Sequence, residues 1–175
     1  MAALNISRVR FLIIEDNPFM RTLLKQVVRA LGVTDIMDAT DGAEGFRLLK
    51  EFVPDIVLLD WEMEPMGGLE FAQLVRGEDS PNRFIPMIMI TAHSDITRVV
   101  KARDAGVNEL MVKPVAVAPL FTRIRAVIER PRMFVESQTY FGPDRRRRAD
   151  PTYTGDDRRA SGGKQPVMAE AAPAA

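Results

Sequence analysis

Residues 56–60 read Ile-Val-Leu-Leu-Asp, four consecutive apolar residues followed by a carboxylate. A short, unbroken apolar run of this kind is typical of a strand that is buried on both faces, as strands of parallel sheets are. Asp60 would then stand where a central strand gives way to a loop.

The same arrangement recurs on both sides of this segment. Apolar runs predict further strands at residues 9–14, 36–39, 86–90 and 109–112. Apolar residues at helical spacing predict helices near residues 18–31, 42–52, 69–76, 95–105 and 117–129. Strands that alternate with helices favour an α/β fold, a doubly wound five-stranded parallel sheet covered on both faces.

The amino-acid composition disfavours several classes of function. The chain has 175 residues, with 24 Lys and Arg against 24 Asp and Glu, so its net charge is zero. That balance gives no bulk attraction to nucleic acid or to a membrane. There is no Cys, which excludes thiolate zinc sites and cysteine nucleophiles. No apolar stretch reaches the roughly 20 residues that a membrane span needs, and we expect a cytoplasmic protein.

The pattern predicts a domain over residues 1–130 and a separate tail over residues 131–175. The tail is rich in Arg, Pro and Gly without a sustained period, so we expect it to be largely disordered. It contains a short repeat in which Tyr, Gly, Asp and two Arg keep the same spacing. The first copy is Tyr140, Gly142, Asp144, Arg145 and Arg146, and the second is Tyr153, Gly155, Asp157, Arg158 and Arg159.

The repeat favours a docking peptide for a downstream protein, with a plain solvated tail as the second interpretation. Arg145–Arg148 could contact nucleic-acid phosphates. The interleaved aspartates, such as Asp144 and Asp150, disfavour that third interpretation.

Acidic residues follow two of the predicted strands. Glu15 and Asp16 come directly after residues 9–14, and Asp60 follows the central strand. Ligand sites of doubly wound folds lie at the carboxyl ends of the strands, so these carboxylates should converge. Clustered carboxylates repel and need a cation, and oxygen ligands favour Mg²⁺. The simpler alternative is that Glu15 and Asp16 merely end a strand and precede a helix.

Two further strand ends carry complementary groups. Lys113 follows one strand and precedes Pro114, and Thr91 follows another. The ammonium could pair with Asp60 or with phosphate oxygens, and the hydroxyl could bind another phosphate oxygen. Each is ordinary alone, but the combination at neighbouring strand ends points to phosphoryl chemistry.

The set Glu15-Asp16, Asp60, Thr91 and Lys113-Pro114 resembles the response-regulator receiver domain of two-component signalling over about residues 7–130. The resemblance implies a flavodoxin-like (βα)5 fold with strand order 2-1-3-4-5. It implies that Asp60 is the phosphoacceptor and that Thr91 and Lys113 contact the phosphoryl group. It further implies a Mg²⁺ site made by Glu15, Asp16, Asp60 and the backbone carbonyl of Glu62, and a cis bond before Pro114.

The chain departs from the family at positions that modulate signalling. Leu110 stands where many relatives have Tyr or Phe, so an aromatic rotamer switch is absent. Glu62 and His93 occupy the positions two residues after Asp60 and Thr91, which by resemblance influence dephosphorylation. The alternative for His93 is that it is a solvent-facing loop residue without a functional role.

The resemblance implies a single-domain response regulator that takes its phosphoryl group from a histidine kinase or phosphotransfer protein. It implies self-catalysed phosphoryl transfer and autodephosphorylation, and no separate enzymatic activity. Output would pass through phosphorylation-dependent protein binding, a phosphorylation-dependent homodimer included. A phosphate sink, a phosphorelay intermediate and a phosphorylation-independent scaffold are the alternatives. A haloacid-dehalogenase-like phosphatase is disfavoured, because Glu62 replaces the second Asp that such enzymes need.

Overall fold

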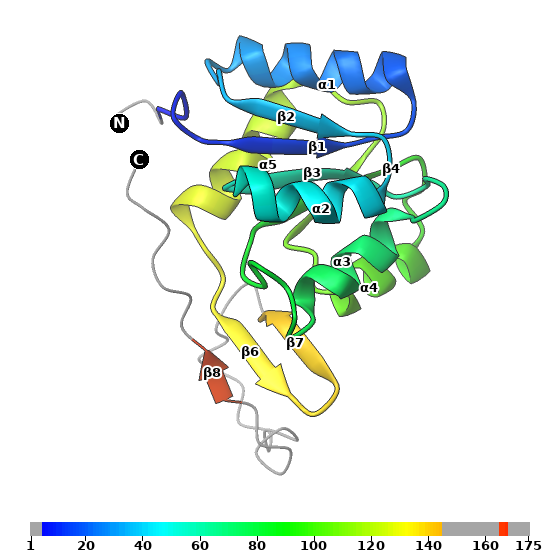
Figure 1. Ribbon diagram of the computed structural model, residues 1–175, viewed down its shortest axis with the longest axis vertical. Helices are drawn as coiled ribbons and strands as arrows, with labels where there is room; N and C mark the ends of the chain where they lie inside the picture. The colour runs from blue at the N-terminus through cyan, green and yellow to red at the C-terminus, as the bar shows by residue number, and fades with distance from the viewer. Residues whose placement is uncertain (1–4, 145–164, 168–175) are drawn as a thin grey trace.

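The computed structural model describes residues 5–144 and 165–167 (Figure 1). Its main sheet has five parallel strands in the order β2-β1-β3-β4-β5, which confirms the predicted fold class and strand order. The strands are β1 (Phe11–Ile14), β2 (Ile36–Ala39), β3 (Ile56–Asp60), β4 (Met87–Thr91) and β5 (Glu109–Val112). The helices are α1 (Pro18–Ala30), α2 (Gly42–Phe52), α3 (Gly68–Arg76), α4 (Ile96–Asp104) and α5 (Val117–Glu129).

Short polar side chains start three of the helices. The side chain of Asn17 accepts hydrogen bonds from the first free N–H groups of α1, and Asp41 and Asp95 do the same for α2 and α4. These groups would otherwise lack partners inside the helix. Each cap fixes where the chain turns from the carboxyl end of a strand into the following helix.

The sheet is covered on both faces because its strands are apolar on both faces. Phe11 and Ile13 pack with α1 and α5, whereas Leu12 and Ile14 point the other way and pack with α2 and α3. This alternation follows from the two-residue period of a strand. Polar residues are instead gathered at the carboxyl ends of β1, β3 and β4, along one edge of an otherwise apolar layer.

Helix α4 is the least buried of the five. Of its nine described residues only Ala102 is buried, whereas each of the other helices buries at least three. Ile96 and Val99 of α4 are 74% and 39% exposed. Few apolar contacts thus hold α4 against the sheet.

The segment after residue 130 is not disordered throughout, because the ordered chain continues into an antiparallel hairpin. Strands β6 (Phe134–Ser137) and β7 (Tyr140–Pro143) pair across a two-residue turn, and β8 (Gln165–Val167) pairs with the other edge of β6. The prediction of disorder fails for residues 134–143. Figure 1 shows the hairpin beyond the end of the main sheet, next to α3.

An aromatic cluster explains why this short hairpin forms. Phe134 and Phe141 pack edge-on against Phe84, with ring centroids 5.2 Å apart in both pairs. The guanidinium of Arg76 lies 5.0 Å from the Phe134 ring, and that of Arg83 lies 3.4 Å from the Phe141 ring. Such aromatic and cation–π contacts supply the burial that two four-residue strands lack alone.

The hairpin also covers a buried cation. Arg76 is 5% exposed and donates to the carbonyls of Gly106 and Arg83 and to the side chain of Asn108. Burial lowers the pKa of Arg76 to about 9. These partners lie at the amino-terminal ends of β4 and β5, opposite the acidic strand ends.

The first copy of the repeat is used inside the molecule. Tyr140 is buried, and its hydroxyl donates to the carbonyl of Pro143 at 2.8 Å. A side chain at Gly142 would approach Gly106 Cα at 2.9 Å, so the close packing there requires Gly. Both residues are therefore committed to packing, which contradicts their expected place in a docking peptide. Arg145, Arg146 and the whole second copy lie outside the described residues.

Within the described ranges, none of the helices combines the length and the apolar character that crossing a bilayer requires.

Candidate functional site

Three carboxylates gather at the carboxyl ends of β1 and β3. Ile14 and Leu59 are paired in register, so Glu15 and Asp60 follow side by side, and Asp16 is next in the chain. One carboxylate oxygen from each of the three lies within 4.8 Å of the others. Glu15 and Asp60 are 1% and 3% exposed, and Asp16 is exposed. The predicted acidic cluster is thus present.

Lys113 reaches into this cluster from the end of β5. Its Nζ lies 2.6 Å from Asp60 Oδ1 and 3.3 Å from Glu15 Oε2. The bond between Lys113 and Pro114 is cis, as expected, and the Glu64–Pro65 bond is cis as well. One ammonium among three ionised carboxylates leaves a net charge of about −2, because a single positive charge offsets only one of them.

The pKa values of Glu15 and Lys113 reflect this crowding. Burial raises the pKa of Glu15, and repulsion from Asp60 raises it further against the opposing effect of Lys113. Burial alone would lower the pKa of Lys113, but its hydrogen bond and charge attraction to Asp60, with the charge of Glu15, raise it. Lys113 therefore stays charged at neutral pH, and a cation bound nearby would favour the ionised form of Glu15.

The donor set fits a hard divalent cation. Carboxylate oxygens of Glu15, Asp16 and Asp60 are the ligands that Mg²⁺ prefers, and the cluster carries uncompensated negative charge. These three residues are the ones that would hold the ion. The backbone carbonyl of Glu62 remains an expectation from the sequence.

Glu15→Gln is expected to weaken Mg²⁺ binding roughly 10-fold, by analogy with the loss of a group that supports a metal site. Protons compete with Mg²⁺ for Glu15, and its pKa is raised. As the pH is lowered, the Mg²⁺ affinity of the wild type should therefore begin to fall at a higher pH than it would if Glu15 had the pKa of a free Glu. The Glu15→Gln variant should lose part of this pH dependence. Calorimetric titrations from pH 8 to pH 5 measure both effects. Glu78→Gln, at an exposed position of the α3–β4 loop, is the control. Equal affinity in the two variants would contradict a role for Glu15.

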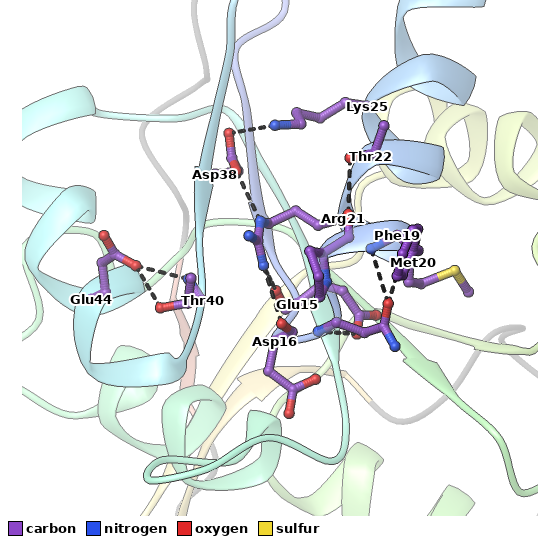
Figure 2. Close-up of polar contacts among 12 residues, drawn as sticks. Glu15, Asp16, Phe19, Met20, Arg21, Thr22, Lys25, Asp38, Thr40 and Glu44 are labelled. Atoms are coloured by element: carbon purple, nitrogen blue, oxygen red, sulfur yellow. Dashed lines mark hydrogen bonds and ion pairs between the residues drawn. The ribbon is translucent and has the colours of Figure 1, made fainter.

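Arg21 of α1 holds the acidic loop in place, as Figure 2 shows. Its Nη1 donates to the backbone carbonyl of Glu15 at 2.7 Å and to that of Asp16 at 3.3 Å, and its Nε pairs with Asp38 at 3.0 Å. The backbone N–H of Asn17 donates to the Glu15 carboxylate at 3.2 Å. Sequence reasoning missed Arg21, because nothing in a helical arginine signals which loop it contacts.

Thr91 and His93 lie beside the cluster on β4 and the loop after it. Asp60 pairs with Ile90 in register, so Thr91 is one residue beyond, and it is 1% exposed. The backbone N–H of His93 donates to Thr91 Oγ1 at 3.1 Å. The His93 side chain is half exposed, and its Nε2 lies 3.7 Å from Glu62 Oε1.

The loop after Asp60 carries a second polar cluster. The backbone N–H of Glu62 donates to Asp60 Oδ2 at 2.9 Å, and its side chain accepts from Arg98 Nη1 of α4 at 2.8 Å. The hydrogen bond from Arg98 lowers the pKa of Glu62. Arg98 was absent from the expected site, because its sequence spacing from Glu62 carries no signal of a contact.

Gly68 packs close to the acidic cluster at the start of α3, and Leu110 lies in β5, the strand that ends before Lys113. A side chain at Gly68 would lie within 2.0 Å of the backbone carbonyl oxygen of Asp60, so α3 can start this close to β3 only with Gly at that position. Leu110 is half-buried and packs against the core on the α2 and α3 face. No aromatic ring occupies position 110.

An open groove lies next to the acidic cluster. It is lined by Asn17, Phe19, Met20, Leu23 and Lys113. Phe19 is 86% exposed and Leu23 is 41% exposed, and their four-residue spacing puts both on one face of α1. The groove therefore places an apolar surface of α1 beside the ammonium that contacts Asp60.

Comparison with known proteins identifies the family to which the chain belongs. Residues 11–125 match the family model described as response regulator receiver domain. The chain is 32% identical over 130 residues to chemotaxis protein CheY-3 of Vibrio cholerae serotype O1, covering 74% of this chain and 99% of that protein. It is 32% identical over 122 residues to chemotaxis protein CheY of Pseudomonas aeruginosa, covering 70% and 98%.

Solved structures show the same fold. Vibrio cholerae chemotaxis protein CheY4 superposes with a TM-score of 0.64 at 23% identity, covering 69% of this chain and 98% of that chain. A CheX-CheY-BeF3-Mg complex from Borrelia burgdorferi superposes with a TM-score of 0.62 at 28% identity, covering 68% and 88%. The family match spans the five-stranded domain and every strand end described above. The chain therefore belongs to the response regulator receiver domain family of two-component signalling.

Proposed function

We propose that Asp60 accepts a phosphoryl group from the phosphohistidine of a histidine kinase or phosphotransfer protein. The observation that carries the proposal is the position of Lys113 Nζ, 2.6 Å from Asp60 Oδ1 in a cluster with Glu15 and Asp16. A carboxylate can act as the nucleophile, and a cation in contact with it offsets the negative charge of an incoming phosphoryl group.

The only co-reactants are the phosphohistidine donor, for phosphoryl transfer to Asp60, and water, for the return to the free carboxylate. A carboxylate oxygen of Asp60 forms a bond to phosphorus while the P–N bond of the donor breaks, and its electron pair stays on the imidazole nitrogen. Hydrolysis of the acyl phosphate by water returns the carboxylate and releases inorganic phosphate. The protein therefore modifies itself, and we propose no separate substrate.

The surrounding groups have distinct tasks. Lys113 would offset negative charge on the transferred group, and the Thr91 hydroxyl would donate a hydrogen bond to one of its oxygens. Bound Mg²⁺ would supply further neutralisation of the phosphoryl oxygens. Because every one of these groups stands at a strand end, the parallel sheet sets their spacing.

Chemical trapping tests the proposal directly. The protein is incubated with Mg²⁺ and acetyl phosphate, then treated with borohydride, which reduces an aspartyl phosphate to homoserine. Mass spectrometry of the peptides should find homoserine at position 60 and nowhere else. Homoserine at another position, or phosphate bound stably through a side-chain hydroxyl, would overturn the assignment of Asp60.

We infer that the groove beside Lys113 receives the phosphohistidine donor. Its apolar wall, Phe19 with Met20 and Leu23, is exposed and within reach of anything that approaches Asp60 past Lys113. Exposed aromatic side chains of this kind often carry much of the energy of a protein contact.

Phe19→Ala is expected to slow phosphotransfer from a protein donor roughly 10-fold, since an anchoring side chain is lost. Acetyl phosphate needs no such contact, so its reaction should be unchanged, and the ratio of the two rates is the measurement. Ile96→Ala, which trims an exposed apolar side chain on α4, is the matched control. If both donors slow equally, Phe19 acts on the site itself and the docking role is wrong.

A further inference from the structure

Helix α4 has fewer buried residues to hold it in place than the other helices that flank the main sheet. It buries only Ala102, and Ile96 and Val99 on its surface are largely exposed. Segments with few buried apolar contacts open locally at low cost in free energy. A contact that ties α4 to a neighbouring loop therefore has a large influence on where the helix lies.

Arg98 makes such a tie from the first turn of α4 to the β3–α3 loop. Its Nη1 donates to Glu62 Oε1 at 2.8 Å, and its guanidinium lies 5.3 Å from the centre of the Trp61 ring. Asp95 accepts from the Arg98 backbone N–H at 3.0 Å and lies near its side chain, with Nε 3.5 Å from Oδ2. Arg98 thus connects the capped start of α4 to the two residues that directly follow Asp60.

The same loop is hydrogen-bonded to the candidate acceptor. Glu62 donates its backbone N–H to Asp60 Oδ2 at 2.9 Å, and its carboxylate lies 3.7 Å from His93 Nε2. His93 in turn donates its backbone N–H to Thr91 Oγ1 at 3.1 Å. A continuous set of contacts therefore runs from Asp60 and Thr91 through Glu62 to Arg98.

We propose that Arg98 couples the position of α4 to the chemical state of Asp60. This inference rests on the proposed function. When the Asp60 carboxylate becomes an acyl phosphate, both the charge and the position of the oxygen that accepts the Glu62 N–H change. The Thr91 hydroxyl also gains a phosphoryl oxygen as a new partner. Glu62 and His93 must then adjust, and the contact between Glu62 and Arg98 changes with them.

The coupling is specific to this chain's side chains. Position 110 holds Leu, so an aromatic ring that turns inward is not available to carry the change. A side chain shifts a conformational equilibrium only by the difference in its contacts between the two states. An exposed ion pair of this type shifts such an equilibrium by about twofold to fivefold.

Arg98→Met tests the coupling in the full chain, because it keeps most of the side-chain volume and removes the charge. Amide hydrogen exchange of residues 96–104 is measured with Mg²⁺, before and after addition of beryllofluoride. In wild type the mimic should speed exchange in α4. In the variant, exchange should already be about twofold to fivefold faster without the mimic, and the further change should be smaller. If α4 of the variant exchanges at the same rates as α4 of the wild type, both without and with the mimic, the proposal is wrong.

Matched variants separate coupling from a general loosening of the helix. Arg103→Met lies on the same helix, where Arg103 Nε pairs with the adjacent Asp104 at 3.1 Å, and should behave as wild type. Glu62→Gln should reproduce part of the Arg98→Met effect, and the double variant should add little to it. Full additivity would show that Arg98 does not act through Glu62.

A second readout keeps the inference apart from the proposed function. Binding of the mimic is followed by fluorine NMR in each variant. If the wild-type protein fails to bind beryllofluoride, the proposed function is wrong. Amide exchange of α4 measured without the mimic would still decide whether Arg98 holds the helix. Binding in all variants with an unchanged α4 would overturn the coupling alone.

Discussion

Asp60→Asn is expected to reduce phosphate incorporation from acetyl phosphate to the background of a sample without donor. The amide that replaces the carboxylate is a poor nucleophile and forms no acyl phosphate. The fold should survive, because the amide oxygen can still accept the N–H of Glu62 and the buried site loses one of its repelling charges. Incorporation of labelled phosphate and the urea unfolding midpoint are measured together.

Asp79→Asn serves as its control, because Asp79 is an exposed carboxylate of the α3–β4 loop. It should incorporate phosphate as wild type does. Label that persists in Asp60→Asn would show that another side chain accepts the phosphoryl group. Loss of label in both variants would show that the assay reports something other than this site.

Phe134→Ala is expected to lower the free energy of unfolding by about 3–5 kcal/mol, the usual cost of removing a buried aromatic side chain. Phe134 is 5% exposed and contacts Phe84, Phe141 and the guanidinium of Arg76. Its loss would open the cover over a buried cation as well as leave a cavity. A small domain has only about 5–15 kcal/mol of stability in total.

Met133→Ala is the matched control, one residue earlier and 51% exposed, and should change the unfolding midpoint little. Phosphate incorporation per folded molecule should be unchanged in both variants, because the hairpin packs at the end of β4 opposite Asp60. If Phe134→Ala and Met133→Ala unfold alike, the hairpin is an accessory and not part of the domain.

The hairpin also changes how the tail is best tested. Removing everything after Pro131 would delete packed residues such as Phe134 and Tyr140. A partner lost by that deletion could be lost through instability alone. Ending the chain after Asp144 keeps both strands of the hairpin but removes β8, which pairs with the other edge of β6. The unfolding midpoint of the shortened chain is therefore measured together with partner binding.

Sequence patterns predicted the elements whose cause is local. Strand β3 is an unbroken apolar run, and the helices follow apolar residues at helical spacing. The acidic cluster was also predictable, because parallel strands bring their carboxyl ends to one edge. Each of these features needs only neighbouring residues and the topology.

Features caused by distant residues were missed. The hairpin has four-residue strands in an Arg- and Pro-rich segment, and its stability comes from Phe84, Arg76 and Arg83 far back in the chain. Arg21 and Arg98 read as ordinary helical surface charges, yet their partners lie in other loops. A periodic pattern records which face a residue occupies, and it does not record which loop the side chain meets.

The place where the hairpin ends has a consequence for signal output. Asp144 donates its backbone N–H to Met133, so the chain leaves β7 at the amino-terminal end of the main sheet. Five residues of β4, about 16 Å of strand, separate that exit from the end of β4 beside Asp60. A short peptide bound at the exit would not touch the acceptor, and it could respond to it only through a change carried along the length of the domain.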